Sequence, residues 1–315
     1  MDASRGAMDS TGRALRYAAV TPTRNEADNL PRLGESLERQ TLRPTAWVVV
    51  DNGSTDDTLA VAEALAARHA WVRVVSVPGA VGTVRGGPVI RAFNAGLGTL
   101  GELPDVVVKL DADVSFEPDH FERLLGEFAA DPALGIASGS CWELENGAWK
   151  ERFTTRAAPR GAVRAYRREC LEAVSPLEER MGWDGIDELK ANLRGWSTRV
   201  LPGVAFRHHR RVGERDASRR AAWEAEGELA HFMGYRPGYL LVRACFRALR
   251  EPSALAMVWA YAGAALRRER RCDDDAARAH LREQQRLRRL PLRAREALGR
   301  RTRPSPAGAA PLGDA

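Results

Sequence analysis

The feature that most constrains the fold is a regular alternation of short apolar runs with helical patterns through the first 130 residues. The segments between the runs place apolar residues three and four positions apart, as at Leu30, Leu33 and Leu37. This alternation predicts an α/β fold whose mostly parallel, doubly wound sheet is flanked by helices. The expected strands are 17–20, 46–50, 72–77 and 106–110, and the expected helices are 29–40, 54–68, 88–100 and 118–130.

Two acidic residues follow the fourth expected strand, where Val106–Leu110 leads directly into Asp111 and Asp113. The carboxyl ends of parallel strands face one crevice, and open α/β sheets bind their ligands there. Two carboxylates in such a place repel each other, and a shared divalent cation relieves the repulsion. Taken alone, Asp-x-Asp is equally the pattern of a solvated turn, so the other strand ends decide between the two interpretations.

The first two strands also end in polar segments. The first runs into Thr21-Pro22-Thr23-Arg24-Asn25-Glu26, and Pro22 is expected to stop it because proline cannot continue a central strand. The second ends in Asp51, in a loop where Ser54 or Thr55 is expected to cap the next helix. Three strand ends therefore bring acidic or polar side chains to one edge of the sheet.

The positive charge of the chain is concentrated in its last third. From Phe206 to Arg303 there are 24 Arg against 12 Asp and Glu, a net charge of +12, whereas the remaining residues sum to −6. A partner at this end should be anionic, and a membrane surface, lipid phosphate and nucleic acid are all candidates. Only 3 of the 48 basic residues are lysine, so part of the excess reflects a compositional bias.

The sequence contains no run of about 18 apolar residues that would span a membrane, and its four cysteines have no metal-ligand spacing. Because no secretory signal is recognisable, a reduced, cytoplasmic compartment is expected. The expected organisation is a disordered lead-in (1–16), a catalytic domain (17–212), a basic helical region (213–303) and a disordered tail (304–315).

Four motifs follow one another between Tyr17 and Asp113: Thr-Pro-Thr-Arg-Asn-Glu, Asp-Asn-Gly-Ser-Thr-Asp-Asp-Thr, Arg-Ala-Phe-Asn-Ala-Gly and Asp-Ala-Asp. Their order and spacing resemble those of a family 2 glycosyltransferase, and the similarity continues less closely to about Arg210. The resemblance implies a GT-A (Rossmann-like) catalytic domain, followed here by a helical C-terminal extension. It also implies a nucleoside-diphosphate-sugar donor, a hydroxyl acceptor, a divalent metal cofactor (Mn²⁺ or Mg²⁺) and no nucleic-acid partner.

The resemblance assigns roles to the residues at the strand ends. Thr21, Pro22 and Glu26 would line the nucleotide pocket, and Asp51 would accept a hydrogen bond from the base. Asp51 beside Asn-Gly is also a common turn former, which is the alternative for this residue.

The diphosphate side of the donor involves three more residues. Asp111 would contact the ribose, and Asp113 would bind the metal that bridges the diphosphate. Arg91 follows the Gly-rich segment 79–87, which lacks the Gly-Lys-Ser/Thr ending of a Walker motif. Its guanidinium would hold the diphosphate through paired hydrogen bonds, and a solvated helix face is the equally weighted alternative.

The catalytic base is expected shortly before Gly195-Trp196. In the family an Asp of a Gly-Glu-Asp motif opens an amphipathic helix that closes at Gly-Trp or Gly-Tyr, and counting back reaches Asp184. Here Trp183 stands where Glu is usual, and Asp187, one helical turn further on, is the rival base. We favour Asp184 and keep both candidates. The base would take the proton of the acceptor hydroxyl, and a single displacement of this kind inverts the anomeric configuration.

His208 and His209 follow a strand expected at 198–201. They resemble the place where related enzymes supply a further metal or diphosphate contact. In an extended segment only one of two successive side chains faces inward. The sequence does not decide which one does.

Helices are expected at 223–233, 238–249 and 253–266, followed by an Arg-rich stretch to 289. Their apolar residues have Arg at the margins, so the helices either pack on the core or lie in a membrane interface. The charge of +12 and the local aromatic residues favour peripheral membrane association, at the inner face of the membrane. These aromatic residues are Tyr235, Tyr239, Trp259 and Tyr261.

The sequence therefore predicts an inverting, metal-dependent glycosyltransferase of lipid-linked or cell-envelope glycan synthesis. The absence of a Gln-x-x-Arg-Trp motif and of membrane-spanning runs favours single addition over processive synthesis. One alternative is a nucleotide-sugar-binding scaffold with a degenerate site, since Trp183 replaces the usual Glu. A nucleotidyltransferase is the other, but it normally needs a basic Gly-rich loop where this chain has Thr23-Arg24-Asn25-Glu26.

Overall fold

The computed structural model describes residue 8 and residues 11–79, 86–145, 147–152, 158–210 and 218–286. The chain divides into two compact units. The sheet unit comprises residues 1–211 with 311–315, and the helical unit comprises residues 212–310. Of the lead-in that was expected to be disordered, the structure describes residues 8 and 11–16, in which Leu15 is buried and Arg13 pairs with Asp105. The expected tail lies wholly outside the described residues.

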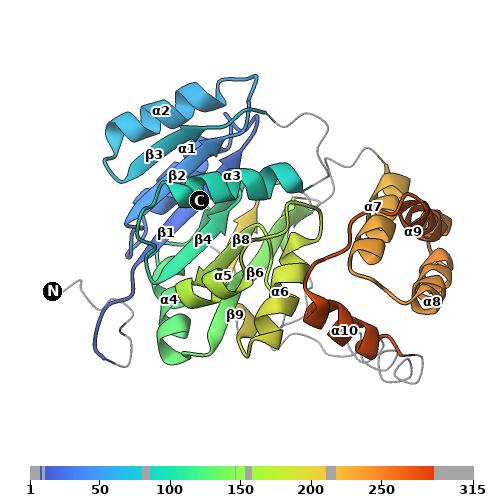
Figure 1. Ribbon diagram of the computed structural model, residues 1–315. Helices are drawn as coiled ribbons and strands as arrows, with labels where there is room; N and C mark the ends of the chain where they lie inside the picture. Colours follow the sequence, from blue (N-terminus) through green and yellow to red (C-terminus); the bar gives the residue numbers. More distant parts are fainter. Residues whose placement is uncertain are drawn as a thin grey trace. The chain divides into compact units, whose positions relative to one another are not determined.

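One nine-stranded sheet forms the centre of the sheet unit (Figure 1). Its strand order is β3-β2-β1-β4-β8-β6-β9-β5, with β7 paired to β6. The neighbours among β1 to β4 are parallel, as are β6 and β9, whereas β5, β7 and β8 run antiparallel to their partners. The strands are β1 (Tyr17–Thr23), β2 (Ala46–Asp51), β3 (Val72–Ser76), β4 (Val106–Leu110), β5 (Val114–Phe116), β6 (Leu134–Glu145), β7 (Ala148–Glu151), β8 (Val163–Arg167) and β9 (Ser197–His208).

Six helices pack against the two faces of this sheet. The core on one face includes residues of α1, α2 and α4, and the core on the other face includes residues of α3, α5 and α6. The α/β fold with flanking helices confirms the prediction. The helices are α1 (Leu30–Glu38), α2 (Thr58–Arg68), α3 (Gly87–Gly98), α4 (His120–Ala130), α5 (Arg168–Val174) and α6 (Trp183–Leu193).

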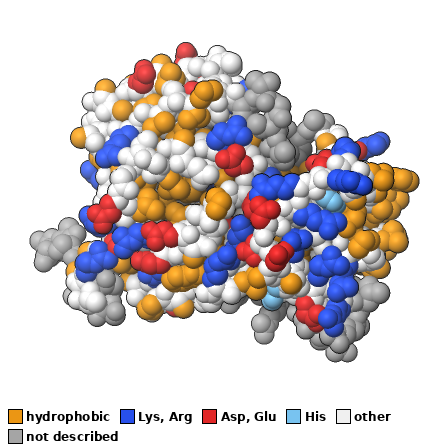
Figure 2. Space-filling view, in the orientation of Figure 1, with side chains coloured by type: hydrophobic (Ala, Val, Ile, Leu, Met, Phe, Trp, Pro, Cys, Tyr) orange, Lys and Arg blue, Asp and Glu red, His pale blue; other side chains and the backbone are white. Residues whose placement is uncertain are grey.

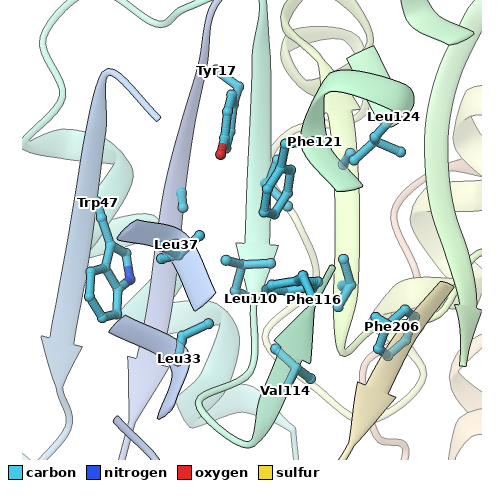
Figure 3. Packing of buried hydrophobic residues seen from close by; sticks show 14 of the residues in the cluster. Tyr17, Leu33, Leu37, Trp47, Leu110, Val114, Phe116, Phe121, Leu124 and Phe206 are labelled. Carbon is cyan, nitrogen blue, oxygen red and sulfur yellow. The ribbon is translucent and has the colours of Figure 1, made fainter. Parts of the chain in front are cut away.

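Side chains of the central strands alternate between the two cores. Trp47 and Val49 belong to the core shown in Figure 3, which also includes Leu33 and Phe121, whereas Val48 lies in the opposite core. Both faces of β2 are therefore apolar and all six of its residues are buried. Strands covered on both faces have continuous apolar sequences, which explains why these were recognisable.

The first strand extends beyond its expected end, through Pro22 to Thr23. The expectation that Pro22 stops the strand was wrong because β4 pairs with β1 only as far as Val20 and Lys109. Beyond that point β1 has β2 as its one strand neighbour. A residue without an N–H therefore interrupts no bond to β4.

The helix cap expected at Ser54 or Thr55 was also wrong. α2 begins at Thr58, with Asp57 at its N-cap position. Ser54 Oγ instead accepts a hydrogen bond from the Asn25 backbone N–H at 3.0 Å, and the Thr55 N–H donates to the Asn25 side chain at 2.8 Å. These two residues fasten the loop after β2 to the loop after β1.

The helical unit contains four described α-helices and a short 3-10 helix. A small core of Ala230, Leu240 and Met257 joins three of these elements. The expected helices of this region are confirmed. Among the described residues, no helix has the length and hydropathy needed to cross a bilayer. The elements are α7 (Arg219–Phe232), α8 (Pro237–Ala248), η1 (Pro252–Leu255), α9 (Ala256–Leu266) and α10 (Asp275–Gln284).

Candidate active site

Three strand ends meet at one edge of the sheet unit. β1, β2 and β4 are parallel neighbours, so their carboxyl ends point the same way. The Asn52 N–H donates to the Thr23 carbonyl at 2.9 Å, which joins the ends of β1 and β2. The Asp111 N–H donates to the Ala162 carbonyl at 2.8 Å and fixes the end of β4.

Asp111, Asp113 and His208 converge at this edge. Their candidate ligand atoms all lie within 4.8 Å of one another, and His208 Nε2 is 3.2 Å from Asp113 Oδ1. Asp113 and His208 are buried. Two carboxylates with one imidazole form a donor set that suits a divalent cation such as Mn²⁺ or Mg²⁺. The residues present therefore fit the cofactor that the sequence predicted.

Of the two predicted histidines, His208 faces this cluster and His209 does not. His209 Nε2 lies 2.8 Å from Ser115 Oγ, and its ring meets the Trp149 ring edge-on at 5.3 Å. His208 is the last residue of β9 and His209 follows it, so the two successive side chains of this extended backbone point in different directions. Burial lowers the pKa of His209 to about 4.

Without a bound cation, His208 and Asp113 would pair as imidazolium and carboxylate, and a cation that binds through Nε2 would displace the proton. Burial alone would lower the pKa of His208, but the hydrogen bond and charge of Asp113 raise it to about 10. Burial likewise opposes ionisation of Asp113, yet His208 and Arg210 hold the pKa of its carboxyl below the usual value. The charge of Asp113 is therefore balanced by groups of the same site.

Two further cations, which the sequence did not single out, contact the acidic residues. Lys109 Nζ contacts the Asp111 carboxylate and donates to the Gly161 carbonyl at 2.9 Å. Arg210 donates to both carboxylate oxygens of Glu26, at 2.7 and 3.0 Å. A lysine inside the apolar run Val106–Leu110 was a visible signal of the first. Arg210 gave no comparable signal in the sequence.

The remaining donor-binding candidates occupy the ends of β1 and β2. Thr21 is fully buried, and its Oγ1 accepts a hydrogen bond from Trp47 Nε1 at 2.9 Å. Pro22 is partly exposed on the same strand. Asp51 is buried and accepts the Ser54 N–H at 3.3 Å, a contact that the turn-forming alternative also explains.

Arg91 lies on α3 and pairs with Glu179, with its Nη2 3.1 Å from Glu179 Oε2. Both side chains are close to half exposed. The guanidinium predicted to hold the diphosphate is thus engaged by a carboxylate from the segment before α6. Residues 80–85 of the Gly-rich segment lie outside the described residues.

The two candidate bases on α6 have different surroundings. Asp187 is 2% exposed and receives hydrogen bonds from Arg164 and from the Tyr166 hydroxyl. Burial raises the pKa of Asp187 to about 6, against the lowering effect of Arg164. Asp184 is partly exposed, and one of its carboxylate oxygens accepts the N–H of Gly185 at 3.1 Å. The structure therefore separates a buried carboxylate from an accessible one.

Arg164 is a further residue of this region that the sequence did not reveal. It is fully buried and donates to the Pro159 carbonyl and to the Asp184 carbonyl, both at 2.6 Å. Its guanidinium also lies 5.8 Å from the centre of the Trp183 ring. Arg164 thus ties β8 to the first turn of α6, where Asp184 is located.

Trp183 lies between the donor-side and base-side groups. Lys109 Nζ is 5.5 Å from the centre of its ring, a distance at which a cation is attracted to an aromatic face. Gly161 leaves room for this packing, since a Cβ there would lie 3.3 Å from both the Trp183 ring and Asp184 Oδ2.

Comparison with known proteins supports a common origin for this architecture. Residues 18–171 match the family model described as Glycosyl transferase family 2. A polyprenol monophosphomannose synthase from Mycolicibacterium smegmatis is 30% identical over 179 residues, which cover 50% of this chain and 64% of the relative. The succinoglycan biosynthesis protein ExoA from Rhizobium meliloti is 31% identical over 204 residues, which cover 57% of this chain and 59% of ExoA. The chain thus spans less than two thirds of either curated relative.

The fold has solved counterparts. The mannosyltransferase PcManGT from Pyrobaculum calidifontis, determined in complex with GDP-Man and Mn²⁺, superimposes with a TM-score of 0.53 at 21% sequence identity. The similarity covers 95% of this chain and 84% of PcManGT. We conclude that residues 18–171 belong to the family 2 glycosyltransferases, and that the fold shared with PcManGT is the GT-A fold.

Proposed function

We propose that the protein is an inverting, metal-dependent glycosyltransferase that moves a sugar from a nucleoside-diphosphate donor to a hydroxyl acceptor. The observation that carries the proposal is the convergence of Asp111, Asp113 and His208 at the edge where β1, β2 and β4 end. The names of the curated relatives, a polyprenol monophosphomannose synthase and a succinoglycan biosynthesis protein, favour cell-envelope or lipid-linked glycan synthesis.

In this proposal the donor binds across the strand ends. Pro22, Glu26 and Asp51 line the nucleotide pocket, while the buried Thr21 supports this strand end through its hydrogen bond with Trp47. Asp111 contacts the ribose, while Asp113 and His208 hold the divalent cation. When bound, the cation supplies Lewis-acid stabilisation of the negative charge that develops on the departing diphosphate.

Asp184 is the proposed base because its carboxylate is accessible, whereas that of Asp187 is held by Arg164 and Tyr166. Asp184 accepts the proton of the acceptor hydroxyl, and the hydroxyl oxygen forms a bond to the anomeric carbon. The bond between that carbon and the diphosphate oxygen breaks, and its electron pair leaves with the diphosphate. Attack from the opposite side inverts the anomeric configuration.

The acceptor is the open part of this proposal. An acceptor of lipid-linked or envelope glycan synthesis is presented at a membrane surface, so the protein acts there as a peripheral protein on the cytoplasmic side. Between Phe206 and Arg303 the chain has 24 Arg and 12 acidic residues. This net positive charge supports the arrangement, because it attracts anionic lipid.

The test is sugar transfer by an Asp113→Ala variant, measured as release of nucleoside diphosphate with a panel of donors and Mn²⁺. We expect turnover to fall at least about 100-fold with the fold intact, because the cation loses a ligand. Glu63→Ala removes an exposed carboxylate on α2 and should retain full turnover. Unchanged transfer by Asp113→Ala would contradict the metal site. Donor binding by the wild-type chain without transfer or hydrolysis would favour the binding-scaffold alternative.

A further inference from the structure

The helical unit exposes an unusual amount of apolar surface. Seven of the nine large hydrophobic side chains that the described residues expose lie between Leu241 and Leu266. Single exposed apolar residues are ordinary on a soluble protein, whereas a cluster of this kind marks an interaction surface. Figure 2 shows hydrophobic side chains gathered over the part of the chain that contains α8 and α9.

On α8 the exposed residues form one stripe. Leu241, Phe246 and Leu249 are 52%, 60% and 82% exposed, while Leu240 and Ala244 on the opposite side are buried in the core of the unit. The spacing places the exposed residues within one sector of the helix. α8 therefore has two apolar sides. One side packs into the core of the helical unit, and the other is exposed.

The segment formed by η1 and α9 repeats this arrangement. Leu255, Trp259 and Leu266 are 44%, 78% and 85% exposed, and their separations of four and seven residues keep them on one side of the helix. Met257, on the other side, is buried. We call the six residues Leu241, Phe246, Leu249, Leu255, Trp259 and Leu266 the apolar face.

The charges beside the apolar face are almost all positive. Between Pro237 and Arg268 the chain has five Arg and a single acidic residue, Glu251. Neither α8 nor α9 contains Asp or Glu. Arg247, Arg250 and Arg268 are exposed next to the apolar residues. Apolar side chains with a bordering row of Arg match the boundary between acyl chains and anionic headgroups.

We propose that the apolar face docks onto the surface of a bilayer that contains anionic lipids. The inference rests on the proposed function, which requires an acceptor at a membrane, and it names the residues that reach the bilayer. Trp259 and the aliphatic residues enter the acyl boundary, and the arginines remain at the lipid phosphates.

The test is sedimentation of the full chain with vesicles, without donor. We expect binding to phosphatidylglycerol/phosphatidylcholine vesicles at least about tenfold tighter than to pure phosphatidylcholine, weakening as salt is raised. The double variant Leu249→Glu/Trp259→Glu should lose at least about tenfold in vesicle binding, because two carboxylates replace the inserting groups. Met8→Glu, the same change at an exposed apolar residue of the sheet unit, should bind as the wild type does.

Three results would overturn this inference. They are no vesicle binding by the wild-type chain, equal binding by the double variant, and a self-associated wild-type chain that the double variant converts to monomer. In the third case a second copy covers the apolar face. Retained donor turnover in the double variant shows that it is folded. Loss of turnover in Asp113→Ala concerns the proposed function and leaves the vesicle result unaffected.

A second, independent observation concerns the far side of the His208 ring. Its Nε2 faces Asp113, and its Nδ1 lies 3.7 Å from Glu143 Oε1. Neither Glu143 Oε1 nor His208 Nδ1, both buried, has a partner within hydrogen-bonding geometry among the described residues, although the Cys141 thiol also contacts the His208 side chain. Glu143 is placed there by the pairing of β6 with β9, in which it lies directly opposite His208.

We infer that Glu143 is a positioning residue for His208 in the proposed metal site. A histidine that binds a cation through Nε2 carries its proton on Nδ1, and a carboxylate acceptor there fixes the tautomer and orients the ring. A movement of less than about 1 Å would close the 3.7 Å separation to hydrogen-bond length.

Mn²⁺ binding by the protein, followed by electron paramagnetic resonance of the free ion, tests this role without enzymatic turnover. Glu143→Gln should weaken Mn²⁺ binding about tenfold, and the proton signal of the His208 Nδ1–H in the Mg²⁺-loaded variant should move upfield, because its carboxylate acceptor is gone. Glu63→Gln, the same change at an exposed residue of α2, should retain the wild-type affinity. Equal affinity of wild type and Glu143→Gln, or an equal loss in Glu63→Gln, would overturn the inference. If Asp113→Ala weakens Mn²⁺ binding and Glu143→Gln does not, the metal site stands and only the role of Glu143 fails.

Discussion

Asp184 and Asp187 lie three residues apart on α6 but have different chemical surroundings. Arg164 and Tyr166 occupy the carboxylate of Asp187 inside the core, whereas Asp184 is partly exposed. A general base must reach the proton that it removes, so the greater accessibility of Asp184 supports the proposal that it is the base. Their spacing alone could not, because side chains three residues apart lie on neighbouring parts of one helix face.

Replacing Asp184 by Asn should lower kcat with little effect on stability. Removing a general base typically costs about 10²- to 10⁴-fold in rate, and Asp184 is partly exposed. Nucleoside diphosphate release under saturating donor and acceptor measures kcat, and urea unfolding measures stability. Full activity in this variant would remove Asp184 from the mechanism.

Replacing Asp187 by Asn should act mainly on folding. Arg164 would remain fully buried without its carboxylate, and breaking a buried ion pair from one side costs about 3–5 kcal/mol. The urea midpoint should fall accordingly. A variant of wild-type stability that lacks turnover, together with an active Asp184→Asn, would exchange the roles of the two residues.

Close approach of α3 to the sheet depends on Gly96. A Cβ on Gly96 would lie 2.5 Å from Val20 Cγ1 and 2.8 Å from Val50 Cγ2, whereas one on Gly98 of the same helix would meet nothing within 4 Å. Gly96→Ala should therefore lower the free energy of unfolding by about 1–3 kcal/mol through overpacking. Gly98→Ala, the matched control, should raise it by up to about 1 kcal/mol. Equal stabilities in urea would show that the helix shifts freely.

The first turn of α4 should make the sheet unit sensitive to acid. His120 is buried, its Nδ1–H donates to the Ala205 carbonyl at 2.9 Å, and burial lowers its pKa to about 4. An unfolded histidine has a pKa of about 6.5, so the unfolded chain binds the proton first. Stability should then fall as the pH drops from about 6.5 to about 4, by about 2 kcal/mol between pH 7.5 and 5. His120→Phe should lack this part of the slope in urea titrations at the two pH values. The same slope in both proteins would mean that other groups cause it.

The strands and helices that the sequence predicted are those with strong local patterns. β6 was not predicted because Ser138, Gly139 and Ser140 resemble a loop. The glycine is nevertheless required, since a Cβ there would lie 1.9 Å from the Val204 carbonyl oxygen, where the register between β6 and β9 shifts. This requirement comes from a strand more than 60 residues away and leaves no local signal.

The candidate site was predictable only where its residues belong to a strong local sequence pattern. Asp111 and Asp113 directly follow an apolar strand, so their position at the sheet edge could be derived from the sequence. The contacts of Arg164 and Arg210 could not, because their carboxylate partners are 23 and 184 residues away. Such long-range pairs of charges are visible only in the folded structure. The structure was likewise needed to show that His208, and not His209, faces the acidic residues.

At the scale of the whole molecule, the two units should respond differently to a donor. A ligand at the strand ends stabilises only the unit that contains its site, by about 2.7 kcal/mol at a concentration 100 times its Kd. In calorimetry we expect a matching nucleoside-diphosphate sugar with Mn²⁺ to raise the transition of the sheet unit by several degrees and to leave that of the helical unit unchanged. Donors with the wrong base, and Mn²⁺ removal by EDTA, provide the controls. An equal rise of every transition would show that the units unfold as one.

Trp183 stands where the family usually has an acidic residue, and its ring is contacted by two cations. Lys109 Nζ lies 5.5 Å and the Arg164 guanidinium 5.8 Å from the ring centre, and Arg164 also donates to the Asp184 carbonyl in the first turn of α6. If the phosphates of a bound donor attract Lys109, its contact with Trp183 weakens, and we expect the first turn of α6 to shift. Donor binding would then precede acceptor binding.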